Sequence, residues 1–191
     1  MGNDYTMSLA PVELDTAAPK AKALLEQAKV QVGFIPNMYG GMANSPGMLA
    51  TYMDGYARFR ADSGFTSAEQ EVVLLTVSRS NACTYCMAAH SMIADRMSQV
   101  PPIVTHALRA GQTLPDTRLA GLSTFTDVML TTRGRPTRED VAAFLAAGYT
   151  EPQILAIVLA IAVKTISNYS NHLFHTTVDP MFAQYAWQPP D

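Results

Sequence analysis

The chain of 191 residues is poor in charge, with charged residues making up only 15% of it, well below the usual quarter. Hydrophobic residues make up 48%. This is enough for a full core with a surplus, and the surplus predicts a subunit interface. The net charge of −3 disfavours nucleic acid or an anionic membrane as the main partner. The length suits one domain spanning residues 1–191.

Long hydrophobic runs are also scarce. The longest, residues 154–163, is about half as long as a membrane-spanning helix. The first residues have neither the basic segment nor the apolar segment of a signal peptide. We therefore expect a cytoplasmic protein without membrane contact. In that compartment a close pair of cysteines is more often catalytic or metal-binding than a structural disulfide.

The sequence lacks the alternating pattern of β-hairpins, and nearly every segment predicts a helix. Capping boxes at 66–69, 137–140 and 150–153 predict three helix starts, and Asn81 is the expected N-cap of a helix ending near residue 97. Further helices are predicted over 19–31, 46–61, 102–110 and 115–132. A weak likeness between residues 66–86 and 150–170 suggests an internal helical duplication.

The only two cysteines stand three residues apart, at Cys83 and Cys86, and His90 follows one helical turn later. A CxxC pair can cycle between dithiol and disulfide, and a neighbouring histidine can tune or protonate the sulfur. On a helix capped by Asn81, Cys83 would lie in the first turn, where the helix dipole favours a thiolate. Cys86 and His90 would share one face of that helix.

On the preceding helix, Glu71, Leu75 and Ser78 fall on one face. Glu71 is set among apolar residues. We expect burial to raise its pKa and to make it useful for moving protons. Ser78 is more typical of helix packing than of a proton relay.

The order Glu71, Ser78, Cys83, Cys86, His90 resembles the Glu-x11-Cys-x-x-Cys-x3-His signature of the alkyl hydroperoxidase D (AhpD)-like proteins. These belong to the carboxymuconolactone decarboxylase superfamily. Residues 33–37 and 44–46 resemble its peroxidase-related branch. The resemblance implies an all-α AhpD-like helical bundle with its redox core at about 45–100. It also implies homo-oligomers (trimers or hexamers, with a dimer as a further option) and thiol-dependent reduction of hydroperoxides.

The resemblance also assigns roles. It places the nucleophile at Cys86, with Cys83 resolving the sulfenate to a disulfide, whereas dipole reasoning alone favours Cys83. Glu71 would accept the thiol proton, and His90 would help to protonate the leaving alkoxide. Tyr85 stands where the best-studied members have a histidine; it can donate a hydrogen bond or line a pocket, but it cannot act as a base near neutral pH. No bound cofactor or metal is expected, because an external thiol or dithiol, either a small molecule or a reducing protein, supplies the electrons.

Four alternatives remain open. The CxxC pair also suits a disulfide oxidoreductase or a redox adaptor for a partner peroxidase. Decarboxylation of a muconolactone-type acid is a second alternative, although the motif offers no Arg or Lys clamp for a carboxylate. Zinc could be held by Cys83, Cys86 and His90, but no second CxxC would complete the site. Finally, the protein could be a structural oligomer with two small buried cysteines.

Overall fold

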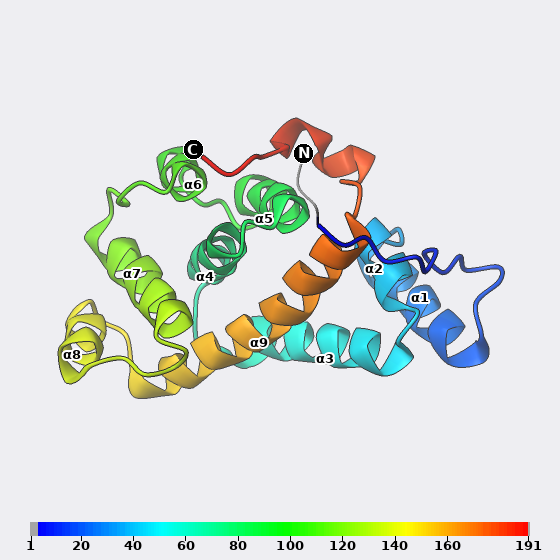
Figure 1. Ribbon diagram of the computed structural model, residues 1–191. Helices are drawn as coiled ribbons and strands as arrows, with labels where there is room; N and C mark the ends of the chain where they lie inside the picture. The colour runs from blue at the N-terminus through cyan, green and yellow to red at the C-terminus, as the bar shows by residue number, and fades with distance from the viewer. Residues whose placement is uncertain (1–3, 191) are drawn as a thin grey trace.

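The computed structural model describes residues 4–190, and it shows an all-α fold without a strand in that range (Figure 1). The prediction of an all-helical protein is confirmed. The elements are α1 (Pro19–Val32), α2 (Asn37–Met42), α3 (Pro46–Asp62), α4 (Ser67–Ser80), α5 (Thr84–Arg96), α6 (Pro102–Ala110), α7 (Thr117–Thr131), α8 (Arg138–Ala146), α9 (Glu151–Phe174) and the 3-10 helix η1 (Pro180–Tyr185).

The predicted helix starts are largely correct. Thr66 and Thr137 each form a full capping box with the acidic residue three positions later, and the Gln153 side chain accepts a hydrogen bond of 2.9 Å from the Thr150 N–H. Ser45 precedes α3 as expected, but its side chain makes no capping hydrogen bond. The sequence analysis does not predict η1.

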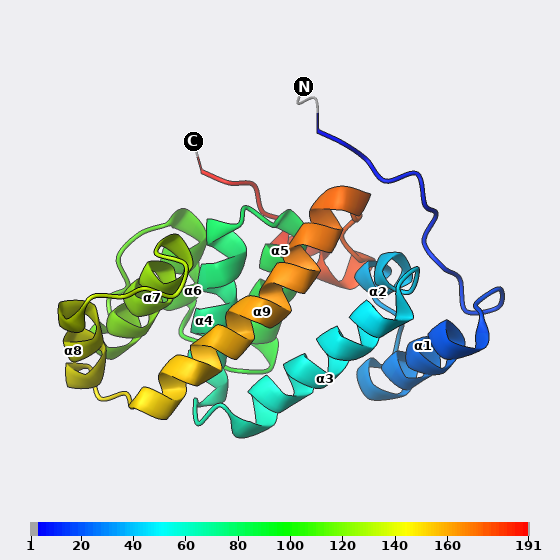
Figure 2. The ribbon, with the colours of Figure 1, turned by 60° about the horizontal axis from the view of Figure 1, so that its bottom comes forward.

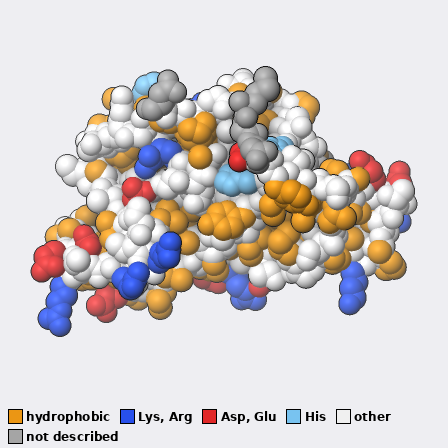
Figure 3. Space-filling model, viewed as in Figure 1, with side chains coloured by type: hydrophobic (Ala, Val, Ile, Leu, Met, Phe, Trp, Pro, Cys, Tyr) orange, Lys and Arg blue, Asp and Glu red, His pale blue; other side chains and the backbone are white. Residues whose placement is uncertain are grey.

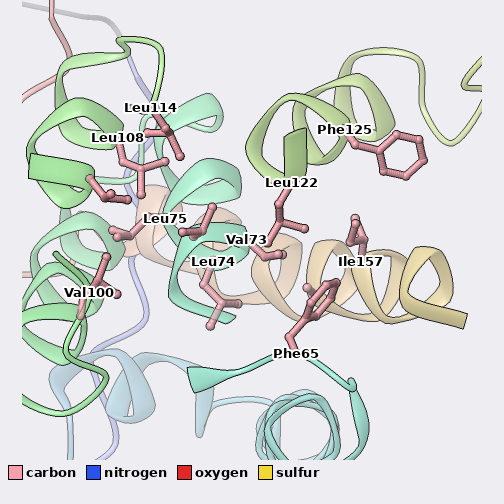
Figure 4. Close-up of a cluster of buried hydrophobic side chains, with 14 of the residues drawn as sticks. Phe65, Val73, Leu74, Leu75, Val100, Leu108, Leu114, Leu122, Phe125 and Ile157 are labelled. Atoms are coloured by element: carbon pink, nitrogen blue, oxygen red, sulfur yellow. The ribbon is translucent and has the colours of Figure 1, made fainter. Parts of the chain in front are cut away.

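Helix α4 lies at the centre of the main core. It packs against α5, α6, α7 and α9, and its residues 69–78 are all buried. Figure 4 shows Val73 of α4 facing Leu122 of α7 and Ile157 of α9. Because every side of α4 is covered, its near-continuous apolar run 72–75 is satisfied without an exposed stripe.

A second buried cluster lies between α1, α2, α3, α5 and the C-terminal segment. Helix α9 crosses the molecule diagonally and contacts both clusters, with α3 running beside it (Figures 1 and 2). The approach of α3 to α9 is close at Gly55, where a Cβ atom would lie 2.9 Å from Val163 Cγ2. A larger residue at this position would push the two helices apart.

The junction between α4 and α5 corrects one prediction. Asn81 does not cap α5; it is the C-cap of α4, and its side chain donates a hydrogen bond of 2.9 Å to Asn168 Oδ1. Ala82 adopts a left-handed conformation with φ of 52°, and Cys83 is itself the N-cap of α5. Cys86 is therefore the third residue of the helix, so the dipole argument applies to Cys86 as well as to Cys83.

Helix α9 is long and apolar enough to cross a membrane, by length and composition only. Its inner face carries the polar residues Lys164, Ser167 and Asn168, all fully buried, which is the behaviour of a core helix in this fold. The helix continues unbroken through 167–170, although the matching residues 83–86 begin a new helix. The internal duplication stays a prediction.

Candidate active site

Cys83 and Cys86 are both free and both buried at the N-terminus of α5. The amide Nδ2 of Asn171, on α9, lies 3.4 Å from Cys86 Sγ and 3.8 Å from Cys83 Sγ. Ser167 Oγ, one turn earlier on α9, lies 3.8 Å from Cys86 Sγ. The sulfur pair is thus enclosed by polar groups of a helix that lies about eighty residues further along the chain.

Glu71 of α4 joins His90 of α5 to Arg60 of α3. His90 Nδ1 lies 2.9 Å from Glu71 Oε2, and Arg60 binds Glu71 Oε1 in a short ion pair. The prediction that burial raises the pKa of Glu71 is wrong. Glu71 is fully buried, and burial does oppose its ionisation, but the charges and hydrogen bonds of His90 and Arg60 outweigh that effect and lower its pKa.

The same contacts define the protonation of His90. Burial, assisted by the charge of Lys164, lowers the pKa of His90 despite the opposing effect of Glu71, so the ring is neutral near pH 7. An ionised Glu71 only accepts hydrogen bonds. Nδ1 of His90 therefore carries the proton, and Nε2 keeps a free lone pair. His90 is a base oriented by Glu71, the arrangement that activates a nucleophile.

The two cysteines differ in their readiness to ionise. Burial opposes the thiolate of Cys86, but a hydrogen bond from Cys83 and the charges of Lys164 and His90 lower the pKa of Cys86 well below its ordinary value. The interaction with Cys86, together with burial, raises the pKa of Cys83. Cys86 is thus the more readily ionised thiol of the pair, and Cys83 is the less readily ionised one.

Tyr85 and Ser78 do not join this proton network. The Tyr85 hydroxyl donates to Asp179 Oδ2, and burial followed by Asp179 raises the Tyr85 pKa. Ser78 donates a hydrogen bond of 2.6 Å to the Leu74 carbonyl of its own helix, and its own carbonyl accepts the Cys83 N–H at 2.9 Å. Tyr85 ties α5 to the segment that precedes η1, and Ser78 holds the α4–α5 junction.

A cavity of about 290 Å³ opens beside Cys86 and His90. Its other lining residues are mainly aromatic side chains and methionines, with no Lys or Arg among them: Phe34, Met38, Tyr39, Tyr52, Tyr56, Tyr85, Met92, Met97, Met181 and Phe182. Such a space suits a small apolar or aromatic molecule. Cys83 does not line it.

Sequence reasoning missed Arg60, Lys164, Ser167 and Asn171. One signal was available, since Lys164 is the only Asp, Glu, Lys or Arg in residues 152–174, and a lone charge on an apolar helix often has a buried role. The zinc alternative finds no further donors, as no group of three or more His, Cys, Asp and Glu residues between 4 and 190 is placed to hold a metal ion.

The structure is similar to several solved structures. An uncharacterized peroxidase-related protein with an AhpD core, from Ralstonia eutropha JMP134, has a TM-score of 0.79 and 21% identity, covering 91% of this chain and 93% of that one. A peroxidase-related protein from Silicibacter sp. TM1040 has a TM-score of 0.75 and 18% identity, covering 95% and 97%. The debrominase Bmp8 in complex with 2,3,4-tribromopyrrole has a TM-score of 0.72 and 16% identity, covering 96% and 97%.

These similarities define an AhpD-like fold over nearly the whole chain. The fold implied by the Glu71–His90 signature is confirmed. No protein-family model matches the sequence, and no curated protein matches it.

Proposed function

We propose that the protein is a thiol-dependent peroxidase that reduces organic hydroperoxides through a Cys83–Cys86 dithiol/disulfide cycle. The observation that carries the proposal is the position of Cys86. The pKa of its thiol is lowered. Its sulfur lies at the wall of an apolar cavity, beside a histidine that a buried carboxylate orients. Nucleophile, base and substrate space therefore meet at one point.

The first step is attack of the Cys86 thiolate on the outer peroxide oxygen. The S–O bond forms as the O–O bond breaks, and His90 Nε2 relays to the leaving alkoxide a proton from water, which replaces the one that Cys86 lost on ionisation. The products are a Cys86 sulfenic acid and an alcohol. Cys83 then attacks the sulfenic sulfur and releases water, which leaves the Cys83–Cys86 disulfide. An external thiol or dithiol returns the two electrons.

Glu71 has a different role from the one that the sequence suggests. Because its pKa is lowered, it is a poor acceptor for the thiol proton. We assign it the orientation of His90 and the stabilisation of the imidazolium that forms during the step, with Arg60 fixing the other carboxylate oxygen.

The burial of both sulfurs favours a peroxidase over the disulfide oxidoreductase. Disulfide exchange with a protein requires in-line access to a sulfur atom, and Cys83 and Cys86 are 0% and 2% exposed. The same burial favours a small thiol or dithiol as the reductant. The decarboxylase alternative is disfavoured because the cavity offers no Arg or Lys for an acidic substrate.

Intact-mass spectrometry tests the proposal. The reduced protein receives a brief pulse of sub-stoichiometric cumene hydroperoxide, and the same pulse is given to Cys83→Ser and Cys86→Ser. We expect the wild type to lose two protons rapidly, Cys83→Ser to accumulate a sulfenic acid, and Cys86→Ser to remain unreacted. Oxidation of the wild type no faster than free cysteine would overturn the proposal, and a sulfenic acid only in Cys86→Ser would move the nucleophile to Cys83.

A second candidate function is reductive dehalogenation of a small aromatic. The aromatic lining of the cavity beside Cys86 favours it, and one similar structure is a debrominase with a bromopyrrole. Here two thiols would become a disulfide while a carbon–bromine bond is replaced by carbon–hydrogen, with release of HBr. Bromide release from tribromopyrrole in the presence of dithiothreitol, dependent on Cys86, would support it; its absence would exclude it for this substrate.

We further propose that the protein is cytoplasmic and forms a homo-oligomer through the outer face of α9. Leu155, Val158, Tyr169 and Leu173 are large exposed hydrophobic residues on that face, and Figure 3 shows hydrophobic side chains along the course of the helix. Exposed apolar surface of this kind commonly marks a subunit interface. Sedimentation equilibrium should show an oligomer that Leu155→Glu weakens; a wild-type monomer would refute the assembly.

A further inference from the structure

Lys164 is a buried lysine with no hydrogen-bond partner. Its side chain is on α9 and is 0% exposed, and no described residue lies within hydrogen-bonding geometry of its Nζ atom. An ammonium group in such an environment is strongly destabilising unless an anion lies close to it. An ionised Lys164 therefore needs a negative charge close to it.

The carboxylate in this region is already occupied. Glu71 Oε1 binds Arg60, and Oε2 binds His90. The remaining groups that can become an anion beside Lys164 are the two cysteine thiols, and of these Cys86 is the one whose pKa is lowered. Ser167 and Asn171, three and seven residues after Lys164 on the same side of α9, both approach the Cys86 sulfur, at 3.8 Å and 3.4 Å. The charge of Lys164 acts on Cys86 and on His90.

We propose that Lys164 is the counter-charge of the Cys86 thiolate and that it shifts the Cys83–Cys86 equilibrium toward the reduced state. In the reduced protein the ammonium and the thiolate compensate each other. Oxidation converts the Cys86 thiolate and the Cys83 thiol into a disulfide, with release of one proton and two electrons. The disulfide is neutral, so Lys164 then remains as an uncompensated buried charge.

The consequence is a strongly oxidising disulfide that weak reductants can open. A disulfide becomes a better oxidant when its reduced form is selectively stabilised. The inference uses the redox cycle of the proposed function, but it concerns the equilibrium between protein thiols and disulfide and does not depend on peroxide as the oxidant.

The test is redox equilibration of the full chain with glutathione and glutathione disulfide at neutral pH, followed by thiol alkylation and intact-mass analysis. The variants are K164M, which keeps length without charge, K164R, which keeps the charge, and Ile157→Val, a buried substitution in the other core cluster on the same helix. We expect K164M to favour the disulfide at least about tenfold more than wild type, equivalent to about 30 mV. K164R and Ile157→Val should stay within about threefold of wild type, a smaller shift than that of a lost buried charge.

The ultraviolet absorbance of the thiolate in the reduced protein provides a second readout, and it should fall in K164M and persist in K164R. Equal constants for K164M and wild type would overturn the proposal, as would equal shifts in K164M and K164R. If K164M does not fold by circular dichroism, K164Q takes its place under the same criteria. If K164M shifts the thiol–disulfide equilibrium but the wild type does not react with peroxide, the counter-charge role of Lys164 stands and the proposed peroxidase function is wrong.

Discussion

The two buried clusters of this protein are built from different chemistry. The cluster around α4, α7 and α9 contains aliphatic side chains and stacked rings such as Phe125 and Phe144, whose centroids lie 4.4 Å apart. The cluster around α5 and α1–α3 contains both cysteines, several methionines and the tyrosines beside the cavity. The buried titratable residues Glu71, His90 and Lys164 lie at its edge.

This difference separates stability from reactivity. The first cluster lowers the free energy of the folded state by removing apolar surface from water. The second contains groups whose burial is unfavourable unless each finds a partner, and the partners are the same groups to which we assign the activation of a sulfur. We therefore expect changes to the first cluster to alter folding alone, and changes to the charged groups beside the second cluster to alter chemistry.

The largest loss of stability should come from the first cluster. Phe144→Ala, at a position 1% exposed, should reduce the free energy of unfolding by about 3–5 kcal/mol because it leaves a cavity between two aromatic rings. Urea titration measures this loss. The peroxide reaction rate per folded molecule should remain that of the wild type, and a parallel loss of rate would show that the two clusters are coupled.

The largest effect on chemistry short of removing a cysteine should come from His90→Gln. Loss of the base should slow sulfenic acid formation by about 10²–10⁴-fold, as measured by rapid quench after a cumene hydroperoxide pulse. His106→Gln provides the matched control, because His106 is exposed on α6. Equal rates in the two variants would remove His90 from the mechanism.

Acid should destabilise the second cluster selectively. The pKa of His90 is lowered from 6.5 and that of Glu71 from 4.5, so below each of these values the unfolded chain takes up a proton that the folded protein resists. The stability contributed by both groups is present above about pH 6.5 and is lost as the pH falls, first through His90 and then through Glu71. Urea titrations from about pH 8 to about pH 4 should show this loss. His90→Gln should abolish its upper part.

The smallest effect should come from Tyr85→Phe. The substitution removes the hydrogen bond to Asp179, but Asp179 still accepts the Asn37 N–H. We expect a loss of about 1–2 kcal/mol in unfolding free energy and little change in the peroxide rate. Tyr5→Phe, at a position 68% exposed, should be neutral. A large loss of rate in Tyr85→Phe would show that Tyr85 takes part in the chemistry.

The sequence predicts local features well. Capping residues and helical spacing were sufficient for most helix starts and for placing Cys86 and His90 on one face, because these depend on residues within one or two turns. The prediction that Asn81 caps the second helix was wrong because Ala82 takes a left-handed conformation. An alanine gives no sequence signal for that conformation. The predicted direction of the Glu71 pKa shift was wrong because His90 and Arg60, from two other helices, both bind its carboxylate.

The residues that α9 contributes to the site could not be predicted from local sequence patterns. Lys164, Ser167 and Asn171 reach the cysteines only because α9 packs across α5 and α4, and no spacing in the sequence encodes that crossing. The lone lysine indicates a buried role, but the choice of Cys86 as its partner depends on tertiary packing.

One wall of the cavity comes from the last part of the chain. Met181 and Phe182 of η1 line it, and Arg109 holds the end of this segment through the Tyr185 and Ala186 carbonyls, at 3.0 and 2.9 Å. Neither residue touches the relay of Arg60, Glu71 and His90 in any described hydrogen bond. Substitutions in this C-terminal segment can therefore reshape the cavity without touching the groups that surround the sulfur atoms.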